Sequence, residues 1–202
     1  MKKLSLFVSF MLFVTPALMA GDSLKPGDAA MDFSLRDISG KTFSLFQMKD
    51  TKGFIVVFTS ITCPVASKYE QRIINLNDQF SSMGYPVIAI NSNDEKVSPG
   101  DSYENMQRVV REKGYKFKYL RDEDQDVAKE YGATNTPHVY VLSWKEGKLM
   151  VEYVGAIDNN IDDPVRADKK YVEDAVNALL KGQEITVSST KAVGCSIKWK
   201  KA

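Results

Sequence analysis

Cys63 stands between a run of apolar residues and a segment that begins with proline. Residues 54–58 (FIVVF) are typical of a buried strand, and Pro64 is favourable at the first position of a helix. This order predicts a thiol at the N-terminus of a helix, at the carboxyl end of a central strand. Backbone N–H groups and the helix dipole favour negative charge there, so the thiol should ionise readily to the reactive thiolate. The alternative is a small buried apolar residue, as free cysteine often is.

The other cysteine, Cys195, leaves three interpretations open. It could form a structural disulfide with Cys63, act as the resolving partner of a reactive thiol, or pair with another molecule. Two cysteines are too few for a disulfide-stapled scaffold or a four-cysteine zinc site.

The N-terminus has the layout of a secretory signal peptide. Lys2 and Lys3 precede an apolar run over residues 4–14, and small residues follow at Ala17 and Ala20. The run is short for the ~20 residues that a membrane span needs. We therefore expect cleavage near Ala20, no stable membrane anchor afterwards, and export, to the periplasm if the source has an outer membrane and otherwise to the medium.

The composition suits one globular domain. The chain has 202 residues, of which 44% are hydrophobic and 26% charged. A formal net charge of +1 gives no support for a nucleic-acid or membrane-surface partner. We expect a signal peptide over residues 1–20, one domain over residues 21–182 and a C-terminal tail over residues 183–202.

Hydrophobic periodicity and turn residues predict an α/β order of elements. The expected strands cover residues 33–35, 42–45, 54–59, 86–91, 117–120, 138–143 and 149–154. The expected helices cover residues 64–82, 102–113, 124–131 and 169–181. The crossover between the third and fourth strands should be right-handed, with those two strands parallel.

These features resemble the thioredoxin-like redoxin superfamily over roughly residues 26–182. Residues 26–35 resemble its opening segment, residues 58–64 (FTSITCP) fall on its active-site motif, and residues 133–137 (ATNTP) fall on its cis-proline loop. Residues 90–94 and 194–200 also look like a peroxiredoxin-like subgroup, of the alkyl hydroperoxide reductase/thiol-specific antioxidant type. The resemblance implies an α/β, thioredoxin-like fold: a central mixed β-sheet flanked by helices, with an N-terminal hairpin and an inserted helix–strand segment.

The motif departs from the thioredoxin pattern at Ser60. Thioredoxins carry Cys-x-x-Cys, whereas this chain reads Ser60-Ile61-Thr62-Cys63, which is similar to the Thr/Ser-x-x-Cys of peroxiredoxins. Ser60 could then donate a hydrogen bond to the thiolate and favour its charged form. The arginine that faces the reactive cysteine of peroxiredoxins is missing, which weakens the case for fast peroxide reduction.

The resemblance also implies roles for the residues around Cys63. Catalytic roles fall on Cys63, Cys195 and Ser60. Thr136, Pro137 and Pro64 would face the substrate, and the bond before Pro137 would be cis.

His138, the one histidine, should be a half-exposed strand residue rather than a metal ligand, and we expect neither a metal nor a cofactor. The leading hypothesis is an exported thiol-dependent oxidoreductase that reduces peroxides or disulfides through Cys63. Cys195 or an external thiol, such as a thioredoxin-like reductant, would regenerate that cysteine. The alternative is a thioredoxin-fold binding or assembly module without turnover, which Ser60 and the missing arginine motivate.

Overall fold

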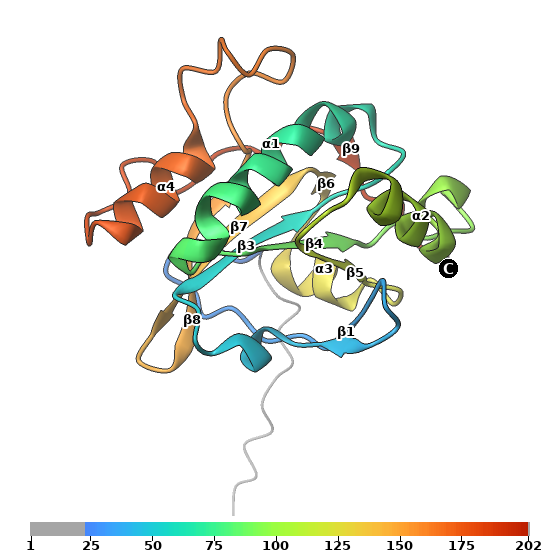
Figure 1. Ribbon diagram of the computed structural model, residues 1–202, viewed down its shortest axis with the longest axis horizontal. Helices are drawn as coiled ribbons and strands as arrows, with labels where there is room; N and C mark the ends of the chain where they lie inside the picture. The colour runs from blue at the N-terminus through green and yellow to red at the C-terminus, as the bar shows by residue number, and fades with distance from the viewer. Residues whose placement is uncertain (1–22, 202) are drawn as a thin grey trace, which may run out of the picture.

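A seven-stranded mixed sheet forms the centre of the protein in the computed structural model, which describes residues 23–201 (Figure 1). The predicted signal peptide lies outside the described residues. The strand order is β2-β1-β5-β4-β3-β7-β8. These strands are β1 (Leu35–Asp37), β2 (Thr42–Phe43), β3 (Gly53–Phe58), β4 (Val87–Asn91), β5 (Lys118–Arg121), β7 (His138–Lys145) and β8 (Lys148–Gly155).

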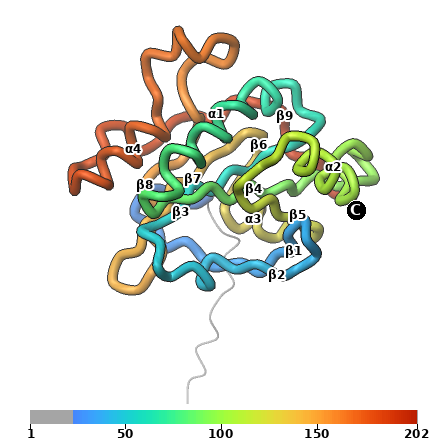
Figure 2. Tube along the Cα trace, in the orientation of Figure 1, coloured from blue at the N-terminus to red at the C-terminus, as the bar shows by residue number. Residues whose placement is uncertain are grey.

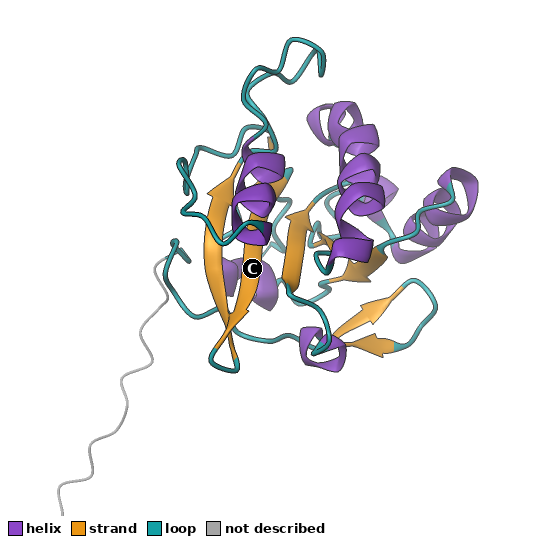
Figure 3. Ribbon diagram, turned by 60° about the vertical axis from the view of Figure 1, so that its left-hand side comes forward, coloured by secondary structure: helices purple, strands orange, loops and turns teal. Residues whose placement is uncertain are grey.

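Helices cover both faces of this sheet (Figure 3). The α-helices are α1 (Pro64–Phe80), α2 (Tyr103–Lys113), α3 (Asp126–Tyr131) and α4 (Tyr171–Leu180), and the 3₁₀ turns are η1 (Leu45–Met48), η2 (Ser81–Met83) and η3 (Pro99–Asp101). In the described part of the chain, no helix is both long and apolar enough to span a membrane.

Strand β3 lies inside the sheet, between β4 and β7. All six of its residues are buried, because it has a strand on each side and a hydrophobic core on each face. Ile55 and Val57 face the core under α1 and α4, whereas Phe54, Val56 and Phe58 face the core that holds α3. As predicted, β3 and β4 are parallel and α1 connects them.

The predicted elements are confirmed with shifts of a few residues at their ends. The first hairpin is shorter than expected, since β1 begins only at Leu35 and residues after Phe43 turn into η1. The hairpin of β7 and β8 turns at Glu146 and Gly147, which both have positive φ (50° and 76°). Ser102 caps α2, its side chain accepting a hydrogen bond from the Asn105 N–H.

The C-terminal segment is docked on the domain, although the sequence predicts no helix or strand in it. A short strand, β9 (Cys195–Ser196), pairs antiparallel with β6 (Asn135–Thr136) in a second, two-stranded sheet. Further back, the Thr190 N–H donates to the Val154 carbonyl (2.9 Å), and Ile197 is buried in the α3-side core. The trace therefore returns from α4 to the start of α1 (Figure 2). We call residues 183–201 the tail.

Candidate active site

Cys63 lies where the sequence predicts it, at the start of α1 and after the end of β3. It is the N-cap residue of the helix, with extended backbone angles, and Pro64 takes the first helical position. The Ala66 N–H points at its sulfur, 3.4 Å away. The residue is only 3% exposed. A sulfur in this position meets the partial positive charge of the helix N-terminus, which favours a thiolate.

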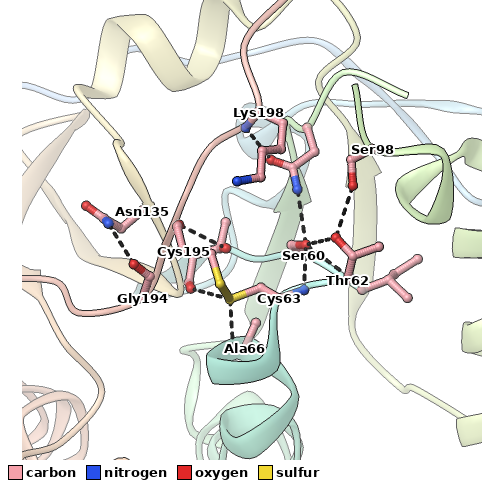
Figure 4. The surroundings of a disulfide bond; sticks show 12 residues. Ser60, Thr62, Cys63, Ala66, Ser98, Asn135, Gly194, Cys195 and Lys198 are labelled. Carbon is pink, nitrogen blue, oxygen red and sulfur yellow. Dashed lines mark hydrogen bonds between the residues drawn. A yellow bond between two sulfur atoms is a disulfide. The ribbon is translucent and has the colours of Figure 1, made fainter. Parts of the chain in front are cut away.

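Cys63 and Cys195 are paired within the chain as a disulfide, which leaves a structural role and a resolving role as the two interpretations of Cys195 (Figure 4). Their Cα atoms are 5.9 Å apart, within the range of ordinary disulfides. Strand β9 brings Cys195 to this position, because Cys195 is the ladder partner of Thr136. Cys195 is a partly exposed residue, whereas Cys63 is buried.

The peptide bond before Pro137 is cis, in agreement with the resemblance. It places the carbonyl oxygen of Thr136 only 3.1 Å from the Cys63 sulfur. Thr136 and Pro137 are buried, and β9 pairs with the backbone at Thr136 that an incoming substrate was expected to meet. Pro64 is exposed beside the disulfide.

Ser60 is close to Cys63 but does not make the expected hydrogen bond to its sulfur. Its hydroxyl oxygen accepts hydrogen bonds from the N–H groups of Thr62 and Cys63, both at 3.2 Å. The hydroxyl proton is directed to the carboxylate of Asp101, with both oxygens 3.1 Å away. Ser60 therefore shapes the loop of residues 59–63, which we call the redox loop.

Asp101 supports the redox loop through hydrogen bonds that the sequence does not predict. Its carboxylate is fully buried and accepts hydrogen bonds from the Ile61 N–H (2.7 Å) and the Thr62 hydroxyl (2.6 Å) as well as from Ser60. Further donors are the side chains of Asn91, Asn93 and Ser98.

The charge of Asp101 is maintained by these donors. Burial by itself would raise the pKa of this carboxyl, but the hydrogen bonds from Thr62, Asn93 and Ser98 outweigh it and hold the pKa below its usual value. A buried carboxylate thus fixes the redox loop through Ser60, Ile61 and Thr62. In the sequence, Asp101 is an acidic residue among small polar residues after a buried strand, and this pattern alone does not predict its contact with the redox loop.

His138 is buried, not half exposed as predicted. It is 8% exposed, and its Nδ1 atom has no hydrogen-bond partner. Burial lowers the pKa of its imidazole to about 4. The prediction fails because His138 pairs with Phe58 on the central strand, where the ring is enclosed by the core and stacks near Tyr140.

No arginine side chain among residues 23–201 hydrogen-bonds to the Cys63 sulfur. Arg72, on the helix that follows, is committed to Asp158 (2.7 Å) and to two backbone carbonyls. Arg121 is buried and donates to the Asn93 carbonyl (2.6 Å). The arginine that is missing from the sequence motif is therefore not replaced by another in contact with the sulfur.

A cavity of about 240 Å³ adjoins the redox loop on its other side, between α1 and α2. Ser60 and Ile61 line it, together with Ala66 and the aromatic residues Tyr115 and Tyr119. Neither cysteine is among its lining residues, so this cavity does not give access to the disulfide.

Comparison with known families identifies the fold. The sequence profile of the AhpC/TSA family matches residues 26–153. No curated protein matches the chain. Two solved structures are each 32% identical to this chain over 90% of its length. One is a hypothetical protein from Sinorhizobium meliloti 1021 (98% of that chain, TM-score 0.80), and the other is an uncharacterized conserved protein from Geobacillus kaustophilus (95%, TM-score 0.82).

A more distant structure shares the fold. The peroxidoxin BcpB from Mycobacterium tuberculosis is 18% identical, with coverage of 79% of this chain and 97% of that chain, and a TM-score of 0.60. These matches confirm the thioredoxin-like α/β fold with a mixed central sheet.

Proposed function

Because the chain belongs to the AhpC/TSA family, we propose that it is a thiol-dependent oxidoreductase in which Cys63 and Cys195 cycle between a dithiol and a disulfide. One observation carries this proposal: the two sulfurs are bonded in the folded chain, and one of them caps the N-terminus of α1. The oxidant is a peroxide or a disulfide, and the electron donor is a thiol such as a thioredoxin-like protein. We propose that the protein works after export, as the signal-peptide pattern of residues 1–20 indicates.

In the oxidative half of the cycle, the Cys63 thiolate is the nucleophile. With a disulfide substrate, a bond forms from Cys63 to one substrate sulfur and the other leaves as a thiolate. With a peroxide, the O–O bond breaks, Cys63 becomes a sulfenic acid and an alcohol or water leaves. In either case the Cys195 thiolate then attacks the Cys63 sulfur, which closes the protein disulfide and releases the substrate thiolate or hydroxide. Ladder pairing at Thr136 holds Cys195 within reach for this step.

In the reductive half, the donor thiolate attacks Cys195, because this is the more exposed of the two residues. The S–S bond breaks, Cys195 forms a mixed disulfide with the donor, and Cys63 leaves as a thiolate. The Ala66 N–H and the helix N-terminus stabilise that leaving group. A second donor thiolate attacks the donor sulfur of the mixed disulfide, so the donor is oxidised and both protein thiols are restored.

One observation favours a disulfide over a peroxide as the oxidant. No arginine among the described residues hydrogen-bonds to the Cys63 sulfur, because Arg72 and Arg121 bind other groups, so the described site supplies no side-chain cation at that sulfur to orient a peroxide. This should slow attack on a peroxide, whereas thiol–disulfide exchange depends on the thiolate and on the leaving thiol.

The test is turnover with a thiol donor, measured with hydrogen peroxide and separately with a disulfide such as oxidised glutathione. We compare the native chain with Cys63→Ser and Cys195→Ser. We expect the native chain to consume disulfide, Cys63→Ser to fall to the uncatalysed rate, and Cys195→Ser to accumulate a mixed disulfide at Cys63. Native turnover equal to that of Cys63→Ser with both oxidants would overturn the proposal.

A binding or assembly module without turnover is the second candidate, and the docked tail is the observation that favours it. Strand β9 already occupies the backbone beside Thr136, and Cys63 is almost completely covered. In that case the disulfide would lock the tail to the domain. A Cys63–Cys195 bond that resists a large excess of dithiothreitol in the folded protein, together with the absence of turnover, would identify this alternative.

A further inference from the structure

We propose that Asn93 is a positioning residue that clamps the redox loop and the tail together and thereby sets the redox potential of the Cys63–Cys195 couple. The inference rests on the proposed function only in that both require this disulfide to form and break. Asn93 follows β4 and is 3% exposed. It contacts neither cysteine in any hydrogen bond of the described structure, so its effect would pass through the segments that carry them.

The carboxamide of Asn93 makes a hydrogen bond with each of these segments. Its Nδ2 group donates to the Ser60 hydroxyl (3.1 Å) and to the Asp101 carboxylate (2.9 Å). Its Oδ1 atom accepts from the Lys198 N–H in the tail (2.8 Å). Figure 4 shows Ser60 on the redox loop and Lys198 on the tail near the disulfide. The route from one cysteine to the other is thus short: Ser60 binds the Cys63 N–H, and Lys198 is in the tail segment that follows Cys195.

Asn93 is itself held rigidly, which a clamp requires. Its N–H donates to the Asn91 side chain (3.0 Å), and its carbonyl accepts from the buried Arg121 (2.6 Å). The next residue adds a second link to the tail, because the Asp94 N–H donates to the Lys198 carbonyl (2.8 Å). Oriented by these bonds, the side chain loses little freedom when it binds both segments.

A clamp that does not depend on the S–S bond affects the stability of that bond. If the tail stays docked when the disulfide is reduced, the two thiols remain close and closing the bond costs little conformational entropy. Without the Asn93 side chain, the reduced tail gains freedom that must be lost again on oxidation. The disulfide would then be less stable relative to the dithiol, and the couple would become more oxidising.

The experiment is to equilibrate purified native chain and Asn93→Ala in glutathione buffers of graded ratio and quantify Cys63–Cys195 disulfide by alkylation and mass measurement. We expect the equilibrium constant for disulfide formation to fall about tenfold, the size expected for loss of one or two buried hydrogen bonds, which raises the potential by about 30 mV. Asn77→Ala is the matched control. Asn77 is 5% exposed and its side chain accepts the Val87 N–H, away from the tail.

Lys198→Pro tests the same clamp from the tail side, at an exposed residue, should Asn93→Ala not fold. It removes the N–H that Asn93 accepts and should raise the potential in the same direction. A purely structural role for Asn93 predicts lower thermal stability of both redox forms with no change in potential, and that result overturns the proposal, as does an equal shift in Asn77→Ala.

The outcomes also separate this inference from the proposed function. If the redox potential shifts in the variants but the native chain shows no turnover, the clamp is supported and the proposed oxidoreductase activity is contradicted. If the native chain turns over and the redox potential is unchanged in Asn93→Ala and Lys198→Pro, the proposed function is supported and the clamp is contradicted. A native chain that forms no Cys63–Cys195 disulfide in any buffer would contradict both.

Discussion

Cys63 and Cys195 meet in space, but the segments that carry them are held in different ways. The redox loop continues a fully buried strand into a helix and lies on the buried carboxylate of Asp101. The tail is held mainly at its backbone: the pairing with Thr136, the Ile197 N–H on the Thr134 carbonyl (2.9 Å) and the Lys198 bonds. One cysteine is thus fixed by a central strand and a buried carboxylate, while the position of the other depends on backbone hydrogen bonds of the tail and on the burial of Ile197.

Substitutions in the two segments should therefore have different effects. Changes beneath the redox loop should act on the folding of the whole domain. Changes along the tail should act on the distance and freedom of Cys195 and leave the domain folded.

Asp101→Asn should cause the largest loss of stability. The amide that replaces the carboxylate has one acceptor oxygen for a set of donors from Ser60, Ile61 and Thr62, so several buried groups lose their partner. We expect the free energy of unfolding to fall by roughly 3–5 kcal/mol, measured by urea denaturation.

Asp122→Asn is the matched control for this change. Asp122 is equally buried, but burial raises its pKa, so its charged form is less favoured than that of Asp101. If Asp101→Asn lowers the free energy of unfolding no more than Asp122→Asn does, Asp101 does not give the redox loop any special support.

His138 should make the stability of the domain sensitive to acid. Because burial lowers the pKa of His138 to about 4 from 6.5, the unfolded chain takes up a proton first as the pH falls. Its contribution to stability is complete above pH 6.5 and is lost as the pH falls towards 4, by up to about 3 kcal/mol. His138→Phe should remove this part of the pH dependence in denaturation curves, and identical slopes in the two proteins would contradict the prediction.

Gly194→Ala should loosen the tail with a smaller effect. A Cβ atom at this position would lie 2.0 Å from the Thr136 carbonyl oxygen, so β9 must move away from β6. We expect the oxidised chain to lose about 1–2 kcal/mol of stability, within the usual range for overpacking, and the reduced chain to lose less.

The neighbouring Val193→Ala is the control, since Val193 is 48% exposed and its change should leave both forms nearly unaffected. If Gly194→Ala lowers the free energy of unfolding equally in the oxidised and reduced forms, the tail is held as firmly as the redox loop.

The sequence predicts the redox loop well because its signals are local. An apolar run, a cysteine and a proline within a few residues are enough to place Cys63 at the start of α1, and the family resemblance implies the cis bond before Pro137. The contacts of Asp101 and of the tail are different, because each joins residues far apart in the chain, such as Ser60 with Asp101 and Asn93 with Lys198. No periodicity or turn residue encodes such contacts.

The same reason accounts for the two expectations about side chains that the structure corrects. Ser60 directs its proton to a carboxylate that arrives from beyond β4, rather than to the sulfur three residues away. His138 is buried because strands from both sides enclose β7. In both cases a partner remote in sequence decides the outcome.

The two half-cystines are separated by 132 positions, and this distance has a consequence for biosynthesis. A ribosome that adds ~5–20 residues per second needs roughly 10 s to travel from one codon to the other. During that interval the residues of α1, of strands β4 to β8 and of the turn at Pro137 are added, while the Cys63 thiol has no other cysteine in the chain to pair with. A disulfide of another molecule can exchange with this lone thiolate, which forms a mixed disulfide and releases the other half as a thiolate, until β9 brings Cys195 to Cys63.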